Sequence, residues 1–497
     1  MKLTYRIRLK RSAADAFAWH ERPGAFERFA PPWVRTEVLH RSGGIRDGGR
    51  LTMVQYLGPL PLRWEIEHVD FIPGRQFCDV ARRSPFRRWR HVHRVESIGP
   101  DACEWIDEVD FAFWGGGLAR GVLGGTTRSE LDRLFAYRQA RLKADLESRP
   151  QAVTGRIVVA GASGLVGSAL TALLSTRGYE VVRLVRRPAQ ASDERFWDPT
   201  RPETLGDVLS GAAALVSLGG AGIADRRWCK ARKAELRSSR LEGTRALVEG
   251  LRRASRPPSV FLSASAIGIY GVNTNRSVDE TSARGDGFLA ELTQDWEQEA
   301  ALAESAGVRP ILLRTGIVLS PRGGALARML PIFRCGLGGP IGRGERGMSW
   351  ISLEDEIAAI ASLLSRPDAR GAYNLVAPNP VSGAEFAREL GRALHRPAFM
   401  PVPVPVLRAA FGEMATETIL ASQWVRPARL LHEGFVFQHA SLGDAVRDML
   451  GTNKASSQLE SRSETLRLLA RAWPACPRRA FFRHPGRASW SSKRAAV

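Results

Sequence analysis

The chain has 497 residues, of which 44% are hydrophobic and 25% are charged, the balance of an ordinary globular protein. This length predicts two to four domains. Five scattered cysteines without a Cys-x-x-Cys pair disfavour both disulfides and a structural zinc site. The sequence has neither an apolar run of eighteen residues nor a signal peptide, so we expect a cytoplasmic protein without a membrane span.

The net charge of +21 raises the question of a nucleic-acid partner. Residues 452–497 carry ten Lys and Arg against two Glu, and the other arginines are spread along the chain without interleaved aromatic residues. We therefore expect no specific nucleic-acid partner. Ser, Arg and Ala dominate residues 452–497 and prolines interrupt them, which predicts a basic, disordered tail. Contact of this tail with RNA or a membrane is the alternative.

The first 149 residues predict an α+β domain in which an antiparallel sheet curls around a long C-terminal helix. A helix capped by Ser12 follows the first strand, and residues 129–147 show helical periodicity. The expected strands cover residues 5–9, 50–56, 62–71, 76–81, 89–96 and 103–113. This pattern, with the segments 61–64 and 73–79, resembles the START-like (SRPBCC) superfamily. The resemblance implies a helix-grip fold with a cavity for an apolar ligand.

His91 and His93 lie two residues apart on one expected strand and so face the same side. A metal pair is conceivable, but no Cys or carboxylate stands at ligand spacing beside them, and Trp89 shares their face. We therefore expect no metal here and favour a half-polar cavity or a surface strand. Trp64, Trp89 and Trp105 are expected in the core or the cavity wall.

The second domain begins with a β-branched strand that runs into three glycines spaced three apart: Gly161, Gly164 and Gly167. A strand that turns directly into a helix aims backbone N–H groups and the positive helix end at one point, which suits a pyrophosphate. The first glycine would allow the turn, the second the approach of the phosphate, and the third the packing of helix on strand. The neighbouring Ser163, Leu165 and Val166 are assigned to the same site.

The next strand ends in Arg186-Arg187, nineteen residues after Gly167. An NAD site carries Asp or Glu at this point to hold the ribose 2′-hydroxyl, whereas an arginine suits a 2′-phosphate. No carboxylate stands there, and Asp193 and Asp198 follow too late in the chain. We therefore expect NADP(H) rather than NAD as the cofactor.

Alternating strands and helices then predict a doubly wound parallel sheet of Rossmann type. The third strand, 213–218, ends at Leu218 and runs into Gly219 and Gly220, and the backbone there would pass close to a dinucleotide. Further strands are expected at 259–265 and 310–314, with a helix over 288–305 between them.

Several motifs in this half resemble an atypical extended short-chain dehydrogenase/reductase of the SDR39U group of epimerase family proteins. They are the glycine triplet and the segments 215–220, 239–244, 263–271 and 313–319. The resemblance spans residues 155–450 and implies a Rossmann domain at 153–365 and a small α+β substrate-side subdomain at 366–451. It also implies cofactor contacts from Arg240 and Ser263. An N-terminal START-like fusion, here 1–149, occurs in this group.

Typical members carry Tyr-x-x-x-Lys on the helix after the fourth strand, and helix 288–305 contains neither residue. Ser265 and Tyr270 are therefore the candidate catalytic residues, with Ser263 as the alternative serine and a structural role as the alternative for Tyr270. Two functions stay open. One is an NADP-dependent oxidoreductase or epimerase whose small, partly apolar substrate the START-like domain captures. The other is a non-catalytic regulator that binds a dinucleotide and a lipid.

Overall fold

The computed structural model describes residues 1–147, 155–274 and 276–452. The linker expected after Arg149 and the basic tail from residue 453 onward lie outside the described residues. None of the helices in the described ranges is long and apolar enough to cross a membrane.

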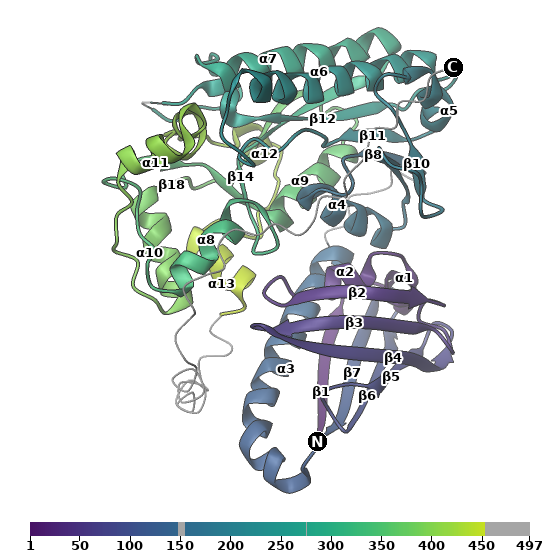
Figure 1. The fold of residues 1–497 in the computed structure, drawn as a ribbon. Helices are drawn as coiled ribbons and strands as arrows, with labels where there is room; N and C mark the ends of the chain where they lie inside the picture. Colours follow the sequence, from purple (N-terminus) through teal and green to yellow (C-terminus); the bar gives the residue numbers. More distant parts are fainter. Residues whose placement is uncertain (148–154, 275, 453–497) are drawn as a thin grey trace, which may run out of the picture. The chain divides into compact units, whose positions relative to one another are not determined.

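The N-terminal region is a seven-stranded antiparallel sheet with the order β1-β7-β6-β5-β4-β3-β2. Figure 1 shows the long helix α3 running beside β1. Large side chains from the sheet and helices, among them Trp19, Trp105 and Leu142, form its core. The elements are β1 (Lys2–Leu9), α1 (Ala13–Glu21), α2 (Ala25–Phe29), β2 (Arg35–Ser42), β3 (Arg50–Leu57), β4 (Leu60–Ile72), β5 (Gln76–Arg83), β6 (Arg88–Gly99), β7 (Ala102–Ala112) and α3 (Gly116–Glu147).

Most expected elements of this region are present, and Ser12 caps α1 by accepting a hydrogen bond from the Asp15 N–H at 3.1 Å. Two elements differ from expectation. Strand β2 was not predicted, because this edge strand is mostly exposed and so lacks a buried alternation. Helix α3 begins at Gly116, whereas the sequence predicts a start near residue 129. The predicted start is too late because the first turns contain several glycines, which disfavour helix.

The second region is a seven-stranded, fully parallel sheet with the order β10-β9-β8-β11-β12-β13-β17, which confirms the predicted Rossmann-type architecture. Helices cover both faces in Figure 1, with α6 and α7 above the sheet and α4 and α9 below it. Its elements are β8 (Arg156–Ala160), α4 (Leu165–Thr176), β9 (Glu180–Val185), β10 (Glu194–Phe196), α5 (Leu205–Leu209), β11 (Ala214–Ser217), α6 (Lys230–Arg253), β12 (Val260–Ala266), α7 (Phe288–Ala301), β13 (Arg309–Thr315), α9 (Leu353–Leu364) and β17 (Gly371–Leu375).

Each face of this sheet has its own core, because successive residues of a strand point to opposite sides. Ile157 and Val159 of β8 pack with the α4 and α9 side, whereas Val158 and Ala160 pack with the α5 and α6 side. The chain leaves β8 first toward β9 and later toward β11. This reversal of strand order beside β8 leaves a crevice at the carboxyl ends of the strands.

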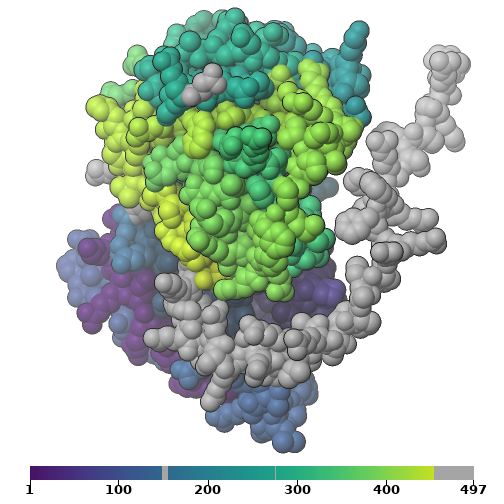
Figure 2. Space-filling model, turned by 90° about the vertical axis from the view of Figure 1, so that its left-hand side faces the viewer, coloured from purple at the N-terminus to yellow at the C-terminus, as the bar shows by residue number. Residues whose placement is uncertain are grey.

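The remaining segments are mainly helical and share a core around Trp350, Phe386 and Leu390. In Figure 2 the green and yellow C-terminal segments lie together on the face turned to the viewer. The sequence predicts an α+β subdomain here, but the strands of these segments form only the short pairs β14–β16 and β15–β18. The elements are β14 (Ile317–Leu319), α8 (Gly324–Arg334), β15 (Gly347–Met348), β16 (Trp350–Ser352), β18 (Val381–Ser382), α10 (Gly383–Leu394), α11 (Val404–Phe411), α12 (Ala428–His432) and α13 (Leu442–Leu450).

Candidate functional site

A cleft of about 380 Å³ opens at the carboxyl ends of β8, β9 and β11. It lies at the reversal of strand order, which is where open α/β sheets bind their ligands. Many of the residues predicted for the cofactor site line it together. They are Gly161, Ser163, Arg186, Arg187, Gly219, Gly220 and Arg240.

The other predicted cofactor residues lie around this cleft rather than in its lining. Gly164 and Leu165 line a second depression at the same turn. Val166 and Leu218 are partly buried and pack against the core of the sheet. Ser263 is fully buried within β12, where its hydroxyl donates to the carbonyl of the next residue at 3.3 Å.

The three glycines of the turn serve different purposes. Gly161 has a φ of +81°, and a Cβ there would lie 2.7 Å from the backbone nitrogen of Gly219. A Cβ at Gly167 would lie 2.1 Å from the carbonyl oxygen of Gly161. Gly164 has a φ of −75°, and a Cβ there would meet its nearest neighbour at 3.4 Å. The turn itself therefore requires the first and third glycines but not the second.

Gly164 is the N-cap of α4, and among the described residues no side chain caps this helix. The backbone N–H groups of its first turn and the positive end of its dipole therefore face the space that Gly164 leaves open. A phosphate supplies both the negative charge and the acceptor oxygens that such a helix end favours. The turn thus fits the pyrophosphate of a dinucleotide.

An acidic residue lines the cleft where the sequence predicted none. The edge strand β10 pairs with β9 and brings Glu194 to the cleft wall. Arg187 donates two hydrogen bonds to Glu194, at 2.7 and 2.8 Å, and Arg183 lies 3.4 Å from it. Arg187 chiefly lowers the pKa of Glu194 to about 2, so the carboxylate is charged and already paired. A strand of three residues carries too little periodicity to have been predicted.

Arg186 differs from Arg187 although the two are adjacent in the sequence. It is exposed and lines the cleft. Within the described part of the chain it makes no ion pair, whereas the charge of Arg187 is taken up by Glu194. The structure therefore singles out Arg186 as the guanidinium of this pair that is available to an anionic ligand.

Arg240 forms part of the cleft wall from within helix α6. Its buried guanidinium donates to the carbonyls of Leu236 and Ala221, at 3.0 and 3.1 Å, and lies 5.2 Å from the centre of the Trp296 ring. Burial lowers the pKa of Arg240 to about 10, yet the group stays protonated at neutral pH. A Cβ at Gly220 would lie 3.2 Å from this guanidinium. Arg240 therefore holds the loop after β11 in place.

Ser265 and Tyr270, the candidate catalytic residues, belong to one hydrogen-bond network. Ser265 donates to Glu297 at 2.6 Å, and Glu297 accepts two bonds from Arg314, at 2.8 and 2.9 Å. Arg314 also donates to the Tyr270 hydroxyl at 3.0 Å, and this hydroxyl donates to Asn374 at 2.8 Å. Neither hydroxyl lines the 380 Å³ cleft. Burial raises the pKa of Tyr270, so its hydroxyl keeps its proton.

Glu297 belongs to this network but is not among the site residues predicted from the sequence. It stands on α7, the helix on which typical relatives carry Tyr-x-x-x-Lys. Thr293 and Ala300, one turn to either side of it, are buried. A glutamate beside the buried face of a helix indicates a charged partner nearby, because an ionised side chain there needs one. This position is the feature of the sequence that could have identified Glu297.

The histidine pair of the first domain is buried, so the surface-strand interpretation is wrong. His91 and His93 are 2% and 5% exposed. The strand register places Asp79 opposite His91 and Asp107 opposite His93. Sequence spacing did not reveal these carboxylates because they come from the neighbouring strands β5 and β7.

Comparison with known proteins identifies the family. Residues 157–376 match the NAD dependent epimerase/dehydratase family, and residues 402–449 match a domain of unknown function, DUF1731. An epimerase family protein of Mycobacterium tuberculosis is 44% identical over 290 residues, which are 58% of this chain and 96% of that protein. The chain belongs to this epimerase family.

Two solved structures extend the comparison. The human epimerase family protein SDR39U1 (isoform 2), with NADPH, is 33% identical, covers 60% of this chain and 100% of its own, and has a TM-score of 0.55. A nucleoside-diphosphate sugar epimerase from Corynebacterium glutamicum is 31% identical, covers 92% of both chains and has a TM-score of 0.71. Because a match of 92% must include most of the N-terminal sheet, this epimerase family protein shares that region with its bacterial relative.

Proposed function

We propose that this epimerase family protein is an NADP(H)-dependent oxidoreductase or epimerase that acts on a small molecule. The observation that carries the proposal is the cleft at the strand reversal, with an uncapped helix N-terminus at one side and the unpaired Arg186 at the other. The human relative whose structure contains NADPH supports the same cofactor. Bound there, the cofactor would supply hydride exchange with a carbonyl or hydroxyl group.

The residues of the cleft divide the binding of this cofactor between them. Backbone N–H groups after Gly164 would hold the pyrophosphate, and Arg186 would hold the 2′-phosphate of the adenosine ribose. The carboxylate of Glu194 would not repel that phosphate, because Arg187 already neutralises the charge of Glu194. Hydrogen bonds to a charged group contribute about 1.5–3 kcal/mol, enough to select NADPH over NADH.

The test is a calorimetric titration of the full chain and its Arg186→Asp variant with NADPH and NADH. We expect wild type to prefer NADPH, and the variant to lose at least tenfold in NADPH affinity with little change for NADH. Arg201→Ala is the matched control, since this exposed arginine lies outside the cleft lining. Equal weakening of both cofactors in the Asp variant would remove Arg186 from phosphate recognition and make Arg187 the next residue to test.

A second function has one specific observation in its favour. Both candidate catalytic hydroxyls are engaged in the network of Glu297 and Arg314, and α7 lacks the usual Tyr and Lys. A non-catalytic regulator that binds the dinucleotide would need only the cleft. Turnover of NADPH with a panel of carbonyl compounds and nucleoside-diphosphate sugars separates the two functions. Tight NADPH binding with no turnover across the panel would favour the regulator.

We also propose that the N-terminal region is a START-like domain that captures the partly apolar substrate. Its aromatic interior supports this idea, with Trp64 and Trp105 buried and Trp89 half-buried beside Trp64. Native mass spectrometry of the full chain purified without detergent should then detect a bound apolar molecule. Release of no such molecule after denaturation would count against this role.

A further inference from the structure

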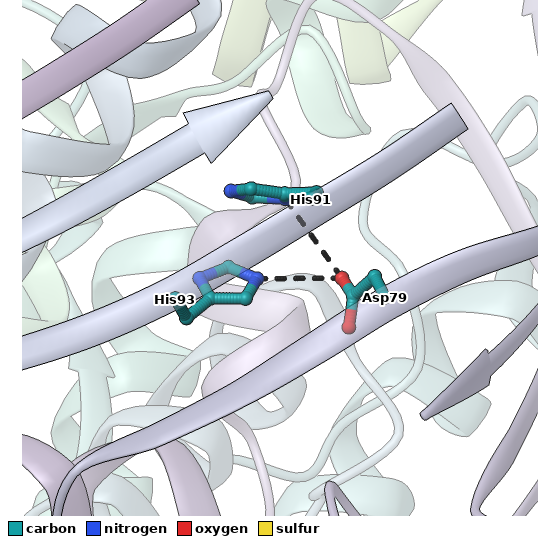
Figure 3. A group of neighbouring side chains, drawn as sticks. All are labelled: Asp79, His91 and His93. Carbon is teal, nitrogen blue, oxygen red and sulfur yellow. Dashed lines mark hydrogen bonds and ion pairs between the residues drawn. The ribbon is translucent and has the colours of Figure 1, made fainter. Parts of the chain in front are cut away.

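Five polar side chains from four adjacent strands meet inside the N-terminal sheet. They are His68 of β4, Asp79 of β5, His91 and His93 of β6, and Asp107 of β7. All come from the same side of their strands, since each is paired across the ladder with another member of the group: His68 with Asp79, Asp79 with His91, and His93 with Asp107. Figure 3 shows Asp79, His91 and His93 facing one another.

Three donor atoms of this group converge. Asp79 Oδ2 lies 3.3 Å from His93 Nε2 and 3.9 Å from His91 Nδ1. The ligand atoms of Asp79, His91 and His93 all lie within 4.8 Å of one another. Donors around a tetrahedral zinc ion are roughly 3.3 Å apart, because each stands about 2.0–2.1 Å from the metal. Small side-chain rotations would therefore give all three atoms ligand distance to one ion.

The other polar atom of each of these residues has a partner that would orient it. His91 Nε2 lies 3.1 Å from Asp107 Oδ1 in a hydrogen bond, and His93 Nδ1 lies 2.8 Å from the same oxygen. His68 Nδ1 lies 2.8 Å from Asp79 Oδ1. Metal-binding histidines nearly always give their second ring N–H to a carboxylate or carbonyl, which fixes the tautomer and the ring. Asp107 Oδ1 lies close to both histidines, and its contact with His91 is an aligned hydrogen bond.

Two of these contacts lack the alignment of a hydrogen bond. The atoms His68 Nδ1, Asp79 Oδ1 and His93 Nδ1 are buried and have no aligned hydrogen-bond partner within the described residues. These atoms are not the three that converge, so they would position the ligands and would not bind the ion. Aromatic rings restrict how the imidazoles can move, because Phe77 stacks on His93 at 4.1 Å between ring centres.

We propose that Asp79, His91 and His93 bind a divalent first-row transition-metal ion, Zn²⁺ or Fe²⁺, inside the N-terminal region. Two imidazoles and one carboxylate suit both ions, as a three-ligand zinc site or as the facial triad of a non-haem iron site. Asp107 and His68 position these ligands without touching the ion. The site is separate from the dinucleotide cleft and shares no residue with it.

The test uses the untagged full chain, dialysed against a chelator and then titrated by calorimetry with Zn²⁺, Co²⁺ and, without oxygen, Fe²⁺. We expect one ion per chain with submicromolar affinity, and a Co²⁺ absorption spectrum that reports its coordination. Because such ligands bind Zn²⁺ more tightly than Fe²⁺ in general, elemental analysis of the untagged chain before dialysis, and not the relative affinity, identifies the resident ion. A wild-type chain that takes up none of the three ions stoichiometrically would overturn the proposal. The cluster would then be a charge network balanced by the half-buried Arg138.

Variants separate ligands from positioning residues. Asp79→Asn and His93→Gln should each lower the metal affinity at least 100-fold, whereas Asp107→Asn should lower it about 10- to 100-fold and leave the stoichiometry at one. His40→Gln, which changes an exposed histidine of the same sheet, should leave the affinity unchanged. Circular dichroism checks that each variant is folded. Wild-type affinity in folded Asp79→Asn and His93→Gln chains would rule out this site.

Discussion

The dinucleotide cleft and the His-Asp cluster of the N-terminal sheet are built in opposite ways. The cleft depends on backbone geometry. Its turn holds the N-terminus of α4, and at two of its glycines a Cβ would clash with neighbouring backbone atoms. The cluster depends on side chains, whose positions come from the register of four antiparallel strands. A site of the first kind tolerates little change in shape, whereas a site of the second kind tolerates little change in chemical identity.

The largest effect should come from Gly167→Ala. The new Cβ would lie 2.1 Å from the Gly161 carbonyl oxygen, so the turn between β8 and α4 must open. We expect a loss of about 3 kcal/mol or more in the free energy of unfolding, measured by urea denaturation, because backbone cannot move aside as a side chain can.

Gly125→Ala in α3 is the matched control for a glycine in a helix. A Cβ there meets nothing within 4 Å, so the free energy of unfolding of this variant should rise by about 0.5–1 kcal/mol. Equal stability of the Gly167 and Gly125 variants would show that the turn does not depend on its backbone contacts.

Gly164→Val should separate binding from folding. The fold leaves space around this residue, so the free energy of unfolding of the variant should stay within about 1 kcal/mol of the wild-type value. NADPH affinity, measured by fluorescence titration, should nevertheless fall at least 100-fold, because the branched side chain would occupy the place of the pyrophosphate. Unchanged affinity in the folded variant would refute the assignment of this turn to the pyrophosphate.

The same contrast explains what the sequence could and could not predict. Gly161, Gly164 and Gly167 are neighbours in the chain, so their spacing reports the geometry of a single turn. The partners of His91 are distant in sequence, and only the strand register brings Asp79 and Asp107 beside the pair. Paired positions in an antiparallel sheet depend on turns and bulges, as between Val69 and Ile72 in β4, that leave little trace in composition.

Continuous apolar runs predict the parallel sheet well, because its central strands are buried on both faces. The edge strand β10, which carries Glu194, has only three residues, and the edge strand β2 is mostly exposed, so neither shows such a run. Glu297 stands on α7, but its partner Arg314 lies on β13, and the spacing of these two residues in the sequence does not indicate that they meet.

A smaller effect concerns Glu356 in α9, a buried side chain within the cofactor-binding region. Thr315 donates to one of its oxygens at 2.8 Å, and the other has no partner among the described residues. Burial raises the pKa of Glu356 to about 8, above its ordinary value of 4.5. The folded state therefore binds more protons than the unfolded state, and this carboxyl costs stability increasingly as the pH rises from 4.5 to 8.

Glu356→Gln removes this titration while keeping an acceptor for Thr315. The variant should match wild type near pH 4.5 and exceed its stability by about 2 kcal/mol or more at pH 8. Thermal unfolding at a series of pH values measures the difference. Parallel stability curves for the two proteins would show that Glu356 is ionised in the folded state.

Tyr270→Phe should have the smallest effect on cofactor binding and decides the role of this hydroxyl. The side chain is 4% exposed, and its loss leaves Asn374 without a donor and Arg314 without one of its acceptors. We expect stability to fall by about 1–2 kcal/mol, since buried polar groups lose a partner. NADPH affinity should stay within about twofold of wild type, because the hydroxyl lies outside the 380 Å³ cleft.

Positioned acid catalysis contributes about 10²–10⁴-fold, so a loss of tenfold or more in kcat at unchanged affinity would make Tyr270 the catalytic acid. Unchanged kcat would instead restrict it to supporting Arg314, and Ser265 would remain as the candidate proton donor of the network.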